Sequence, residues 1–295
     1  MKIGYPCINT SIGCRSSSTF RLASYSEERL VQTVSSNLEC LQKTLEYNKQ
    51  NGLLFFRITS DLVPFASHPV CKFDWAKHFK KQFKQTGLFI KKNKMRVSMH
   101  PDQFVVINSP KADVVKRSVA ELVYHARVLD SLGLDSTAKI QLHLGGVYGD
   151  KPAALERFAK AYKKLPAAVK KRLVIENDDR SYSLANCLGA SERLGFPVLF
   201  DSFHHECLNN GESFKQAVEL AANTWEKKDG ILMVDYSSQK KGGRKCSHTH
   251  HIDLRLFEKF IKQTRPLDFD VMLEIKDKEA SALKARRALE QMGLS

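Results

Sequence analysis

The chain has 295 residues, a formal net charge of +15 and a sequence pI near 9.5. This length suffices for one large domain with a substantial core, and we expect a single domain over residues 1–295. The positive charge disfavours a cationic partner and favours a phosphate-rich one, such as nucleic acid. Because no segment resembles a signal peptide or a membrane span, the sequence argues against a membrane protein and predicts a cytoplasmic one.

Short apolar runs alternate with segments of helical character along the whole chain. The expected strands cover 2–7, 53–58, 96–99 and 139–144, and four more begin at 173, 198, 231 and 270. The expected helices cover 26–51, 74–92, 113–132, 151–164, 183–194, 213–222, 254–262 and 278–292. Eight strand–helix units predict an α/β fold, a single TIM (β/α)8 barrel with its active site at the carboxyl ends of the strands. The alternative, a doubly wound open sheet, would gather its ligands at one switch point.

The seven cysteines are scattered and form no C-x-x-C pair: Cys7, Cys14, Cys40, Cys71, Cys187, Cys207 and Cys246. An odd and scattered set of this kind predicts free thiols in a reducing compartment.

Six of the expected strands end in a residue that can bind a metal or move a proton: His100, His143, Glu176, Asp201, Asp235 and Glu274. Any one of them could be a hydrogen-bonded core residue or a helix cap. Together, at the ends of parallel strands, they would meet at one face of a barrel. Several buried carboxylates would repel one another unless cations lay between them, and imidazole nitrogen suits Mn, Zn or Fe. The pattern therefore predicts a divalent metal site.

Two loops offer further imidazoles. His204 and His205 follow Asp201 closely enough for one of them to reach the same ion, while the other points elsewhere. The loop after the seventh strand contains three more, of which one or two are candidate ligands: His248, His250 and His251.

The same loop carries a flexible basic stretch, with Lys240, Lys241, Arg244 and Lys245. A phosphate backbone is its natural counterpart, although a solvated surface loop would have the same composition. Gln103 and Phe104 follow His100 directly, and such a pair could wedge into a base stack. Their alternative roles are a capping Gln and an ordinary buried Phe.

Motifs along nearly the whole chain resemble those of the UV damage endonuclease family. In order, these are Gly4-Tyr5-Pro6-Cys7 with Asn9, Phe56-Arg57-Ile58, Pro64-Phe65-Ala66-Ser67-His68-Pro69, Ser98-Met99-His100-Pro101, Leu142-His143-Leu144-Gly145-Gly146, Glu176-Asn177-Asp178, Asp201 with His204-His205, Ser237-Ser238-Gln239 and Glu274-Ile275-Lys276. The resemblance implies a TIM barrel that cuts DNA immediately 5′ of cyclobutane pyrimidine dimers, 6-4 photoproducts and other distorting lesions. The products would carry a 3′-hydroxyl and a 5′-phosphate, which starts excision repair.

The resemblance also implies a cofactor and partners. We expect up to three divalent ions, with Mn first and Mg, Zn or Co as other candidates. The partners would be damaged double-stranded DNA and downstream repair enzymes, and the protein would act as a monomer in the bacterial cytosol or nucleoid, away from membranes.

Carried over position by position, the family's metal ligands fall on His100, His143, Glu176, Asp201, His204, His248 and Glu274, with Asp235 at the strand-seven position. His68 would lie close to this cluster, and we expect the catalytic residues to be Glu176, Glu274, His68, His100 and His143. The residues expected to contact the lesion or its flanking backbone are Tyr5, Asn9, Gln103, Phe104 and the four basic residues of the 240–245 stretch.

The chain departs from the family pattern at three positions. Asp235 stands where a relative has His, an exchange that a Mn-like ion tolerates. Met233 stands where that relative has a carboxylated lysine, a modification that Met cannot carry. Phe104 replaces the Tyr of the family's Gln-Tyr probing pair and keeps only the ring for stacking.

Three other functions compete with this interpretation. An abasic-site endonuclease and a metal-dependent sugar isomerase both use His, Glu and Asp clusters in a barrel of this type. A sugar isomerase would need neither the basic loop nor the net charge. A damage-binding protein without catalysis would leave the intact run of carboxylates unexplained.

Overall fold

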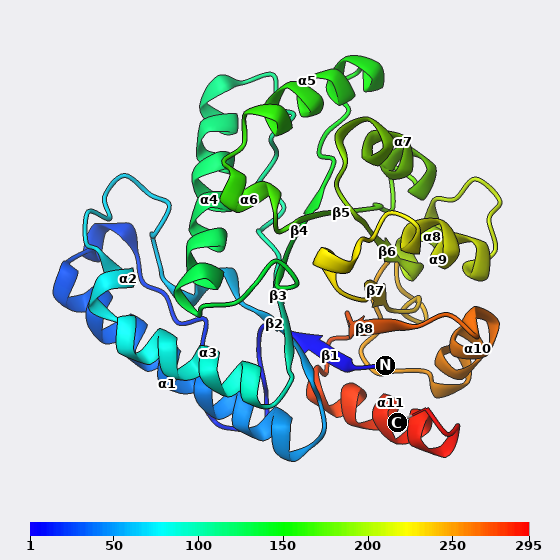
Figure 1. Ribbon diagram of the computed structural model, residues 1–295, viewed down its shortest axis with the longest axis horizontal. Coiled ribbons are helices and arrows are strands. Elements are labelled where there is room, and N and C mark those ends of the chain that lie inside the picture. Colours follow the sequence, from blue (N-terminus) through cyan, green and yellow to red (C-terminus); the bar gives the residue numbers. More distant parts are fainter. Residues whose placement is uncertain (295) are drawn as a thin grey trace.

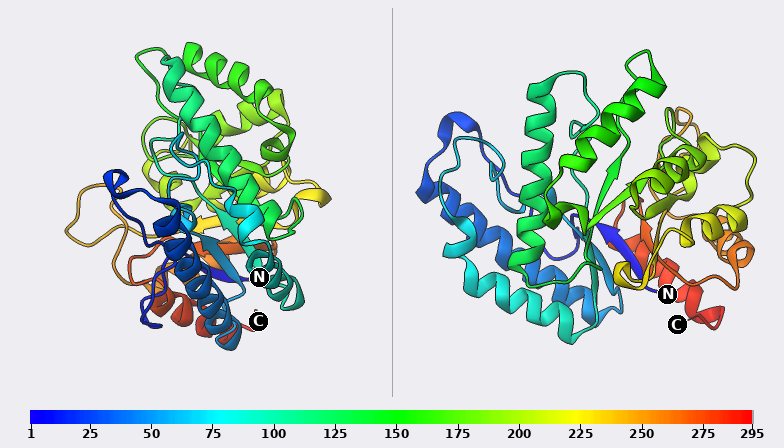
Figure 2. Two further views of the ribbon diagram at one scale, coloured as in Figure 1. Left: turned by 90° about the vertical axis from the view of Figure 1, so that its left-hand side faces the viewer. Right: turned by 45° about the horizontal axis from the view of Figure 1, so that its top comes forward.

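Eight parallel strands close into a barrel in which each strand pairs with its neighbours in the sequence and β1 pairs with β8. The computed structural model describes residues 1–294, and Ser295 lies outside the described residues. The helices surround the strands, and α11 lies beside β1, so that the two ends of the described chain are neighbours (Figures 1 and 2). The predicted TIM barrel is confirmed.

The strands are short and the helices between them vary in length. The strands are β1 (Ile3–Pro6), β2 (Phe55–Ile58), β3 (Arg96–Met99), β4 (Lys139–His143), β5 (Leu173–Glu176), β6 (Val198–Asp201), β7 (Leu232–Tyr236) and β8 (Phe269–Leu273). The helices are α1 (Glu27–Gln50), α2 (Trp75–His78), α3 (Lys80–Lys92), α4 (Ala112–Ser131), α5 (Lys151–Lys164), α6 (Ala167–Lys170), α7 (Leu184–Leu194), α8 (Ser202–Cys207), α9 (Phe214–Ala222), α10 (Leu254–Thr264) and α11 (Glu279–Gln291). Among residues 1–294, no helix has both the length and the apolar character that a membrane crossing requires.

Side-chain caps fix where several helices begin. The side chain of Ser26 accepts a hydrogen bond from the backbone N–H of Arg29 at the start of α1, and Asp150 caps α5 in the same way. The helix predicted over 74–92 is instead two helices. Asp74 caps α2, and the chain leaves helical geometry at Phe79, where φ is −94° and ψ is 18°, before α3 begins.

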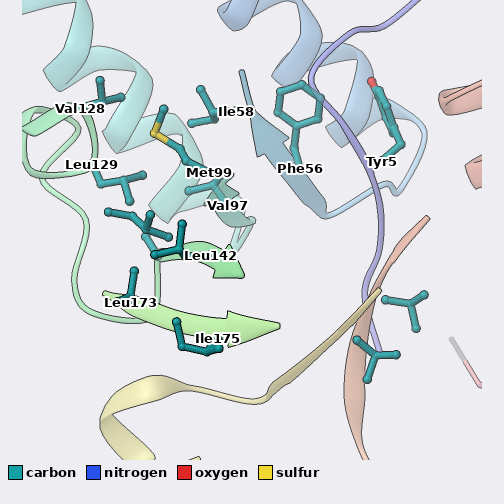
Figure 3. Close-up of a cluster of buried hydrophobic side chains, with 14 of the residues drawn as sticks. Tyr5, Phe56, Ile58, Val97, Met99, Val128, Leu129, Leu142, Leu173 and Ile175 are labelled. Atoms are coloured by element: carbon teal, nitrogen blue, oxygen red, sulfur yellow. The ribbon is translucent and has the colours of Figure 1, made fainter. Parts of the chain in front are cut away.

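The main core lies between the strands and the surrounding helices. Figure 3 shows Val128 and Leu129 of α4 directed toward Met99 of β3 and Leu142 of β4. All four of these side chains are buried. This packing holds the strands in register, and it leaves the inner face of the barrel for other residues.

Inside the barrel a single apolar layer is formed by Phe55, Val174, Leu199, Met233 and Met272, all with no exposed surface. In four of the five strands, the second residue after the apolar one is a predicted metal ligand. These ligands are Glu176, Asp201, Asp235 and Glu274. Since strand side chains alternate between faces with a period of two, the ligands also face the barrel interior, one level nearer the carboxyl ends.

Below this layer, at the amino-terminal end of the barrel, lie two buried ion pairs. The Arg96 guanidinium contacts the Asp270 carboxylate at 3.0 Å, and Lys139 contacts Asp229. The sequence gives no hint of these pairs, because an Arg or Lys inside an apolar run reads as a strand boundary or an exposed residue.

The expectation of free thiols is wrong for four of the seven cysteines. Disulfides join Cys14 to Cys40 and Cys207 to Cys246, whereas the other three cysteines are free. The first links the amino-terminal loop to α1, and the second links the end of α8 to the loop after β7. The paired residues are 26 and 39 positions apart, so only the fold brings them together.

Candidate metal centre

The carboxyl ends of β3 to β8 bring the predicted metal ligands together at one end of the barrel. Three groups could each hold an ion: His100, His143 and Glu176; Glu176, Asp201 and His204; and Asp201, Asp235 and Glu274. In each group, one ligand atom per residue lies within 4.8 Å of the others. The eighth predicted ligand, His248, lies beside this set, with its Nδ1 3.9 Å from Oε2 of Glu274.

Glu176 is the centre of the arrangement. Its Oε2 lies 3.4 Å from Nε2 of His100 and 3.6 Å from Nε2 of His143, and its Oε1 lies 3.2 Å from Nδ1 of His204. Burial would raise the pKa of Glu176, but the three histidines together hold that pKa well below its usual range. The centre therefore contains an ionised carboxylate that two of the three groups share.

Three of the four histidines are oriented by the backbone. In each case Nδ1 donates to a backbone carbonyl. The acceptor of His100 is the carbonyl of Pro101 at 2.7 Å. The acceptors of His204 and His248 are the carbonyls of Asn177 at 3.0 Å and Glu274 at 2.9 Å. A proton fixed on Nδ1 leaves the lone pair on Nε2, which is the usual arrangement in histidines that bind metals. These rings are therefore prepared for coordination through Nε2.

His204 is positioned by α8, in a segment that the sequence analysis takes for a loop. The Asp201 carboxylate caps this helix by accepting a hydrogen bond from the backbone N–H of His204 at 2.7 Å. The cap turns the His204 ring back over Asp201, with Nδ1 to Oδ2 at 3.4 Å. His205 points the other way, and its Nε2 lies 2.9 Å from the carbonyl of Glu212. The choice of His204 over His205 agrees with this geometry.

Charges in this part of the centre are strongly coupled. Burial lowers the pKa of His204, but Asp201 and Glu176 outweigh burial and raise that pKa to about 11. Burial raises the pKa of Asp201 to about 7, although His204 opposes the shift. In the absence of an ion, the imidazolium of His204 is thus the main cation beside these two carboxylates.

Under the centre lies a cation that the sequence analysis does not assign. Arg57 of β2 forms ion pairs with Asp235 and Glu274, and it also donates to the side-chain amide of Gln141. Burial would raise the pKa of Glu274, but the Arg57 charge lowers it to about 2. The only signal in the sequence is the position of Arg57 and Gln141 within apolar runs, and such a position does not distinguish a buried polar residue from an exposed one.

Buried oxygen atoms test whether these residues fit a metal. In the described part of the chain, Oε1 of Glu176, Oδ2 of Asp201 and Oδ1 of Asp235 are buried and accept no hydrogen bond. The oxygens of Glu176 and Asp201 have the charge of His204 nearby, at 3.2 and 3.4 Å from its Nδ1. Buried carboxylate oxygens without a hydrogen bond are costly, and a divalent cation relieves that cost. Carboxylate oxygens with imidazole nitrogens form a donor set for Mn, Zn or Fe. The residues therefore fit a cluster of divalent ions.

A cavity of about 640 Å³ opens over the centre. Its wall includes the four histidines His100, His143, His204 and His248, and its rim includes Gln103 and Arg180. The carboxylates of the centre lie deeper. Next to Gln103, Phe104 is 69% exposed, which argues against the alternative of an ordinary buried Phe.

The basic loop lies between β7 and α10, where Lys241, Arg244 and Lys245 are exposed and Lys240 is half-buried. Gln239 organises this loop, because its Nε2 donates to the carbonyls of Lys240 and Arg244. Cys246, which is disulfide-bonded to α8, lines the same cavity as the histidines. The lysines and arginine are thereby held near the mouth of the site.

Three residues carried over from the family lie outside the metal-binding groups of the described chain. Tyr5 is fully buried, with its hydroxyl 2.6 Å from Oδ1 of Asn48, and the buried Asn9 donates to the Tyr5 hydroxyl at 2.8 Å. Both side chains therefore contribute to the packing of β1 against α1, and their expected contact with DNA stays a prediction. His68 is exposed beside Phe65, and none of the three metal-binding groups formed by the described residues includes it.

Residues 1–293 match the model of the family "UV-endonuclease UvdE". The chain is 43% identical over 294 residues to a UV DNA damage endonuclease of Clostridium perfringens (strain 13 / Type A), covering 99% of this chain and 71% of that protein. It is similar to the crystal structure of SacUVDE, with a TM-score of 0.96, 44% identity and full coverage of both chains. Endonuclease IV from Thermus thermophilus shares the fold alone, with a TM-score of 0.56, 16% identity and coverage of 85% of this chain and 94% of that one.

Proposed function

The chain belongs to the UV-endonuclease UvdE family, and from this premise we propose that it is a metal-dependent UV DNA damage endonuclease. It hydrolyses the phosphodiester immediately 5′ of cyclobutane pyrimidine dimers, 6-4 photoproducts and other distorting lesions, leaving a 3′-hydroxyl and a 5′-phosphate. The observation that carries the proposal is the convergence of seven possible metal ligands, six of them at the carboxyl ends of strands and the seventh, His204, on α8.

Divalent ions would be held by the carboxylates and histidines of the centre, and Mn is the expected metal, with Mg, Zn or Co as alternatives. The ligands are His100, His143, Glu176, Asp201, His204, Asp235, His248 and Glu274. Bound ions of this kind activate water and neutralise charge on a phosphodiester in hydrolysis. Their number is expected to reach three.

The protein's own residues hold and orient the DNA. The basic loop binds the phosphate backbone, and its four cations make the affinity fall with salt. Gln103 and Phe104 enter the space that the lesion vacates. A dimerised pyrimidine pair is poorly stacked, so that bending the duplex and extruding the pair costs less than it does for intact DNA. Selectivity for damage follows from this difference in cost.

The competing activities use the same fold, so the barrel does not separate them. The exposed Phe104 and the basic loop beside the cavity favour DNA over a sugar substrate. We propose that one domain over residues 1–295 acts as a monomer in the bacterial cytosol or nucleoid. There it passes the nicked strand to downstream repair enzymes.

Nicking of supercoiled plasmid tests the proposal. Irradiated, untreated and abasic-site plasmids are incubated with the protein and Mn²⁺, Mg²⁺ or a chelator. We expect nicks in irradiated plasmid that disappear with the chelator. Nicks confined to abasic plasmid would move the activity to abasic-site repair. An absence of nicking would refute the nuclease proposal and leave damage binding or sugar isomerisation.

A single substitution tests the centre itself. Glu176→Gln removes the shared negative charge and should abolish nicking while damaged-DNA binding is retained. Glu192→Gln is a matched control, because Glu192 is exposed on α7, and it should nick like the parent. Normal nicking by Glu176→Gln would refute the role of Glu176.

A further inference from the structure

Arg57 is a cation enclosed in the barrel directly beneath the metal centre. Only 3% of its surface is exposed. Its Nη2 lies 2.6 Å from Oδ2 of Asp235 and 2.8 Å from Oε1 of Gln141, while its Nη1 is paired with Oε1 of Glu274. One guanidinium of β2 thus contacts side chains from β4, β7 and the residue after β8.

Gln141 extends the contacts of Arg57 to the shared carboxylate. Because its Oε1 accepts from Arg57, its Nε2 is left to donate, and it donates to Oδ2 of Asp235 and Oε2 of Glu176. Three carboxylates of the centre are therefore each held through one oxygen from below: Asp235 by Oδ2, Glu274 by Oε1 and Glu176 by Oε2.

The second oxygen of each of these carboxylates is left for another partner. In the described chain, Oδ1 of Asp235 and Oε1 of Glu176 are buried without a hydrogen bond. Oε2 of Glu274 lies on the side of His248, 3.9 Å from its Nδ1. Asp235 and Glu274 thus each have one oxygen engaged by Arg57 and one oxygen available to an ion. Glu176 differs, because its Oε2 accepts from Gln141 and also faces His100 and His143.

We infer that Arg57 is a positioning residue of the metal centre, which fixes the carboxylates of Asp235 and Glu274 so that their remaining oxygens face the ions. The inference rests on the proposed function, since it assumes that the centre binds divalent metal. Planar guanidinium suits this role, because its fork can hold two carboxylates in fixed directions at once. Residues behind metal ligands commonly contribute about 10- to 100-fold to metal affinity.

A purely structural role for Arg57 makes a different prediction, and the barrel contains a matched control. Arg96 of the adjacent β3 is also buried and also faces inward, but it pairs with Asp270 below the apolar layer. Arg57→Met and Arg96→Met each remove a buried guanidinium and leave carboxylates unpaired. Both should therefore lower stability, whereas only Arg57→Met should weaken metal binding.

The experiment measures Mn²⁺ binding to metal-free protein by calorimetry, with unbound Mn²⁺ counted by electron paramagnetic resonance. We expect Arg57→Met to bind at least one ion about 10- to 100-fold more weakly than the parent, and Arg96→Met to bind with parental affinity. Unchanged or tighter Mn²⁺ binding by Arg57→Met would overturn the inference. Such a result would mean that the Arg57 charge only repels the ion and does not position its ligands. An equal loss in Arg96→Met would overturn it as well.

Arg57→Lys keeps the inference testable if Arg57→Met does not fold. Lysine keeps the positive charge but cannot hold Asp235 and Glu274 with a planar fork, so we expect a smaller loss of Mn²⁺ affinity with little loss of stability. Parental affinity in this variant would show that charge alone suffices and would overturn the positioning role. Plasmid nicking is scored separately. A parent that binds Mn²⁺ without nicking irradiated DNA would refute the nuclease proposal and leave the role of Arg57 supported by the affinities.

Discussion

Binding of a divalent ion at pH 7 should release protons from the centre, mainly from His204. A metal needs the neutral imidazole. Burial lowers the pKa of His204, but Asp201 and Glu176 raise it from its ordinary value of 6.5 to about 11 in the metal-free protein. At pH 7 the protonated form of this imidazole is then favoured over the neutral form by about 10⁴. Loss of that proton makes the free energy of metal binding about 5 kcal/mol less favourable.

Calorimetric titration with Mn²⁺ in two buffers of different ionisation enthalpy measures the number of protons released. We expect about one from His204. Asp201 adds about half a proton, because burial raises its pKa to about 7. His204→Ala should lose the larger contribution, while His250→Ala, which alters an exposed imidazole outside the three groups, should behave like the parent. Release of fewer than about 0.3 protons by the parent would refute the coupling of His204 to the ion.

The sign of the pH dependence follows from the raised pKa of His204. Through His204 alone, apparent metal affinity should rise about tenfold for each unit between pH 6 and pH 8, since fewer imidazoles then hold a proton. Asp201 should add about another tenfold over the whole range, because its pKa of about 7 lies within it. Stability of the metal-free protein should change in the opposite direction. The contribution of His204 is fully present below pH 6.5 and is lost as the pH rises through about 11.

Three further outcomes concern the surface, the lower barrel and the cysteines. Phe104→Ala should reduce the ratio of affinities for irradiated and intact duplex, because about 1–3 kcal/mol of stacking is lost; an unchanged ratio in fluorescence anisotropy would contradict the wedge. Asp270→Asn should lower the free energy of unfolding by about 3–5 kcal/mol, since Arg96 stays buried without its partner; a loss below about 1 kcal/mol in urea denaturation would mean that water reaches the guanidinium. Thiol titration in denaturant without reductant should find three free cysteines, and Cys207→Ser should raise the number to four by freeing Cys246. Seven reactive thiols in the parent would show that neither disulfide forms.

Strand ends could be predicted because a parallel barrel repeats one pattern. An apolar run followed by His, Asp or Glu marks both the strand and its functional end. The ends of the predicted elements differ from those observed by at most two residues once the break at Phe79 is set aside, whereas the short helices α6 and α8 have no predicted counterpart. The choice of His204 also agrees with the structure. It needed the family resemblance, since His204 and His205 are equivalent by composition alone.

The direction of a side chain within a strand could not be predicted in the same way. Strands buried on both faces show no alternation of polar and apolar residues, so that the sequence does not say which positions point inward. The contact of Tyr5 with α1 and the inward direction of Arg57 are two features that the strand sequences do not reveal. The disulfides could not be predicted for a related reason. Their cysteines are 26 and 39 residues apart, and only the completed barrel brings them into contact.

The apolar layer of Phe55, Val174, Leu199, Met233 and Met272 separates two charged ends of the barrel. Above it lie the carboxylates that await divalent ions, and below it lie the ion pairs of Arg96 and Lys139. Groups on opposite sides share no partner, and the effects of changes at distant sites without shared partners usually add. A lineage could therefore alter the ligands at the upper end, one carboxylate or imidazole at a time, while the lower end kept the barrel folded.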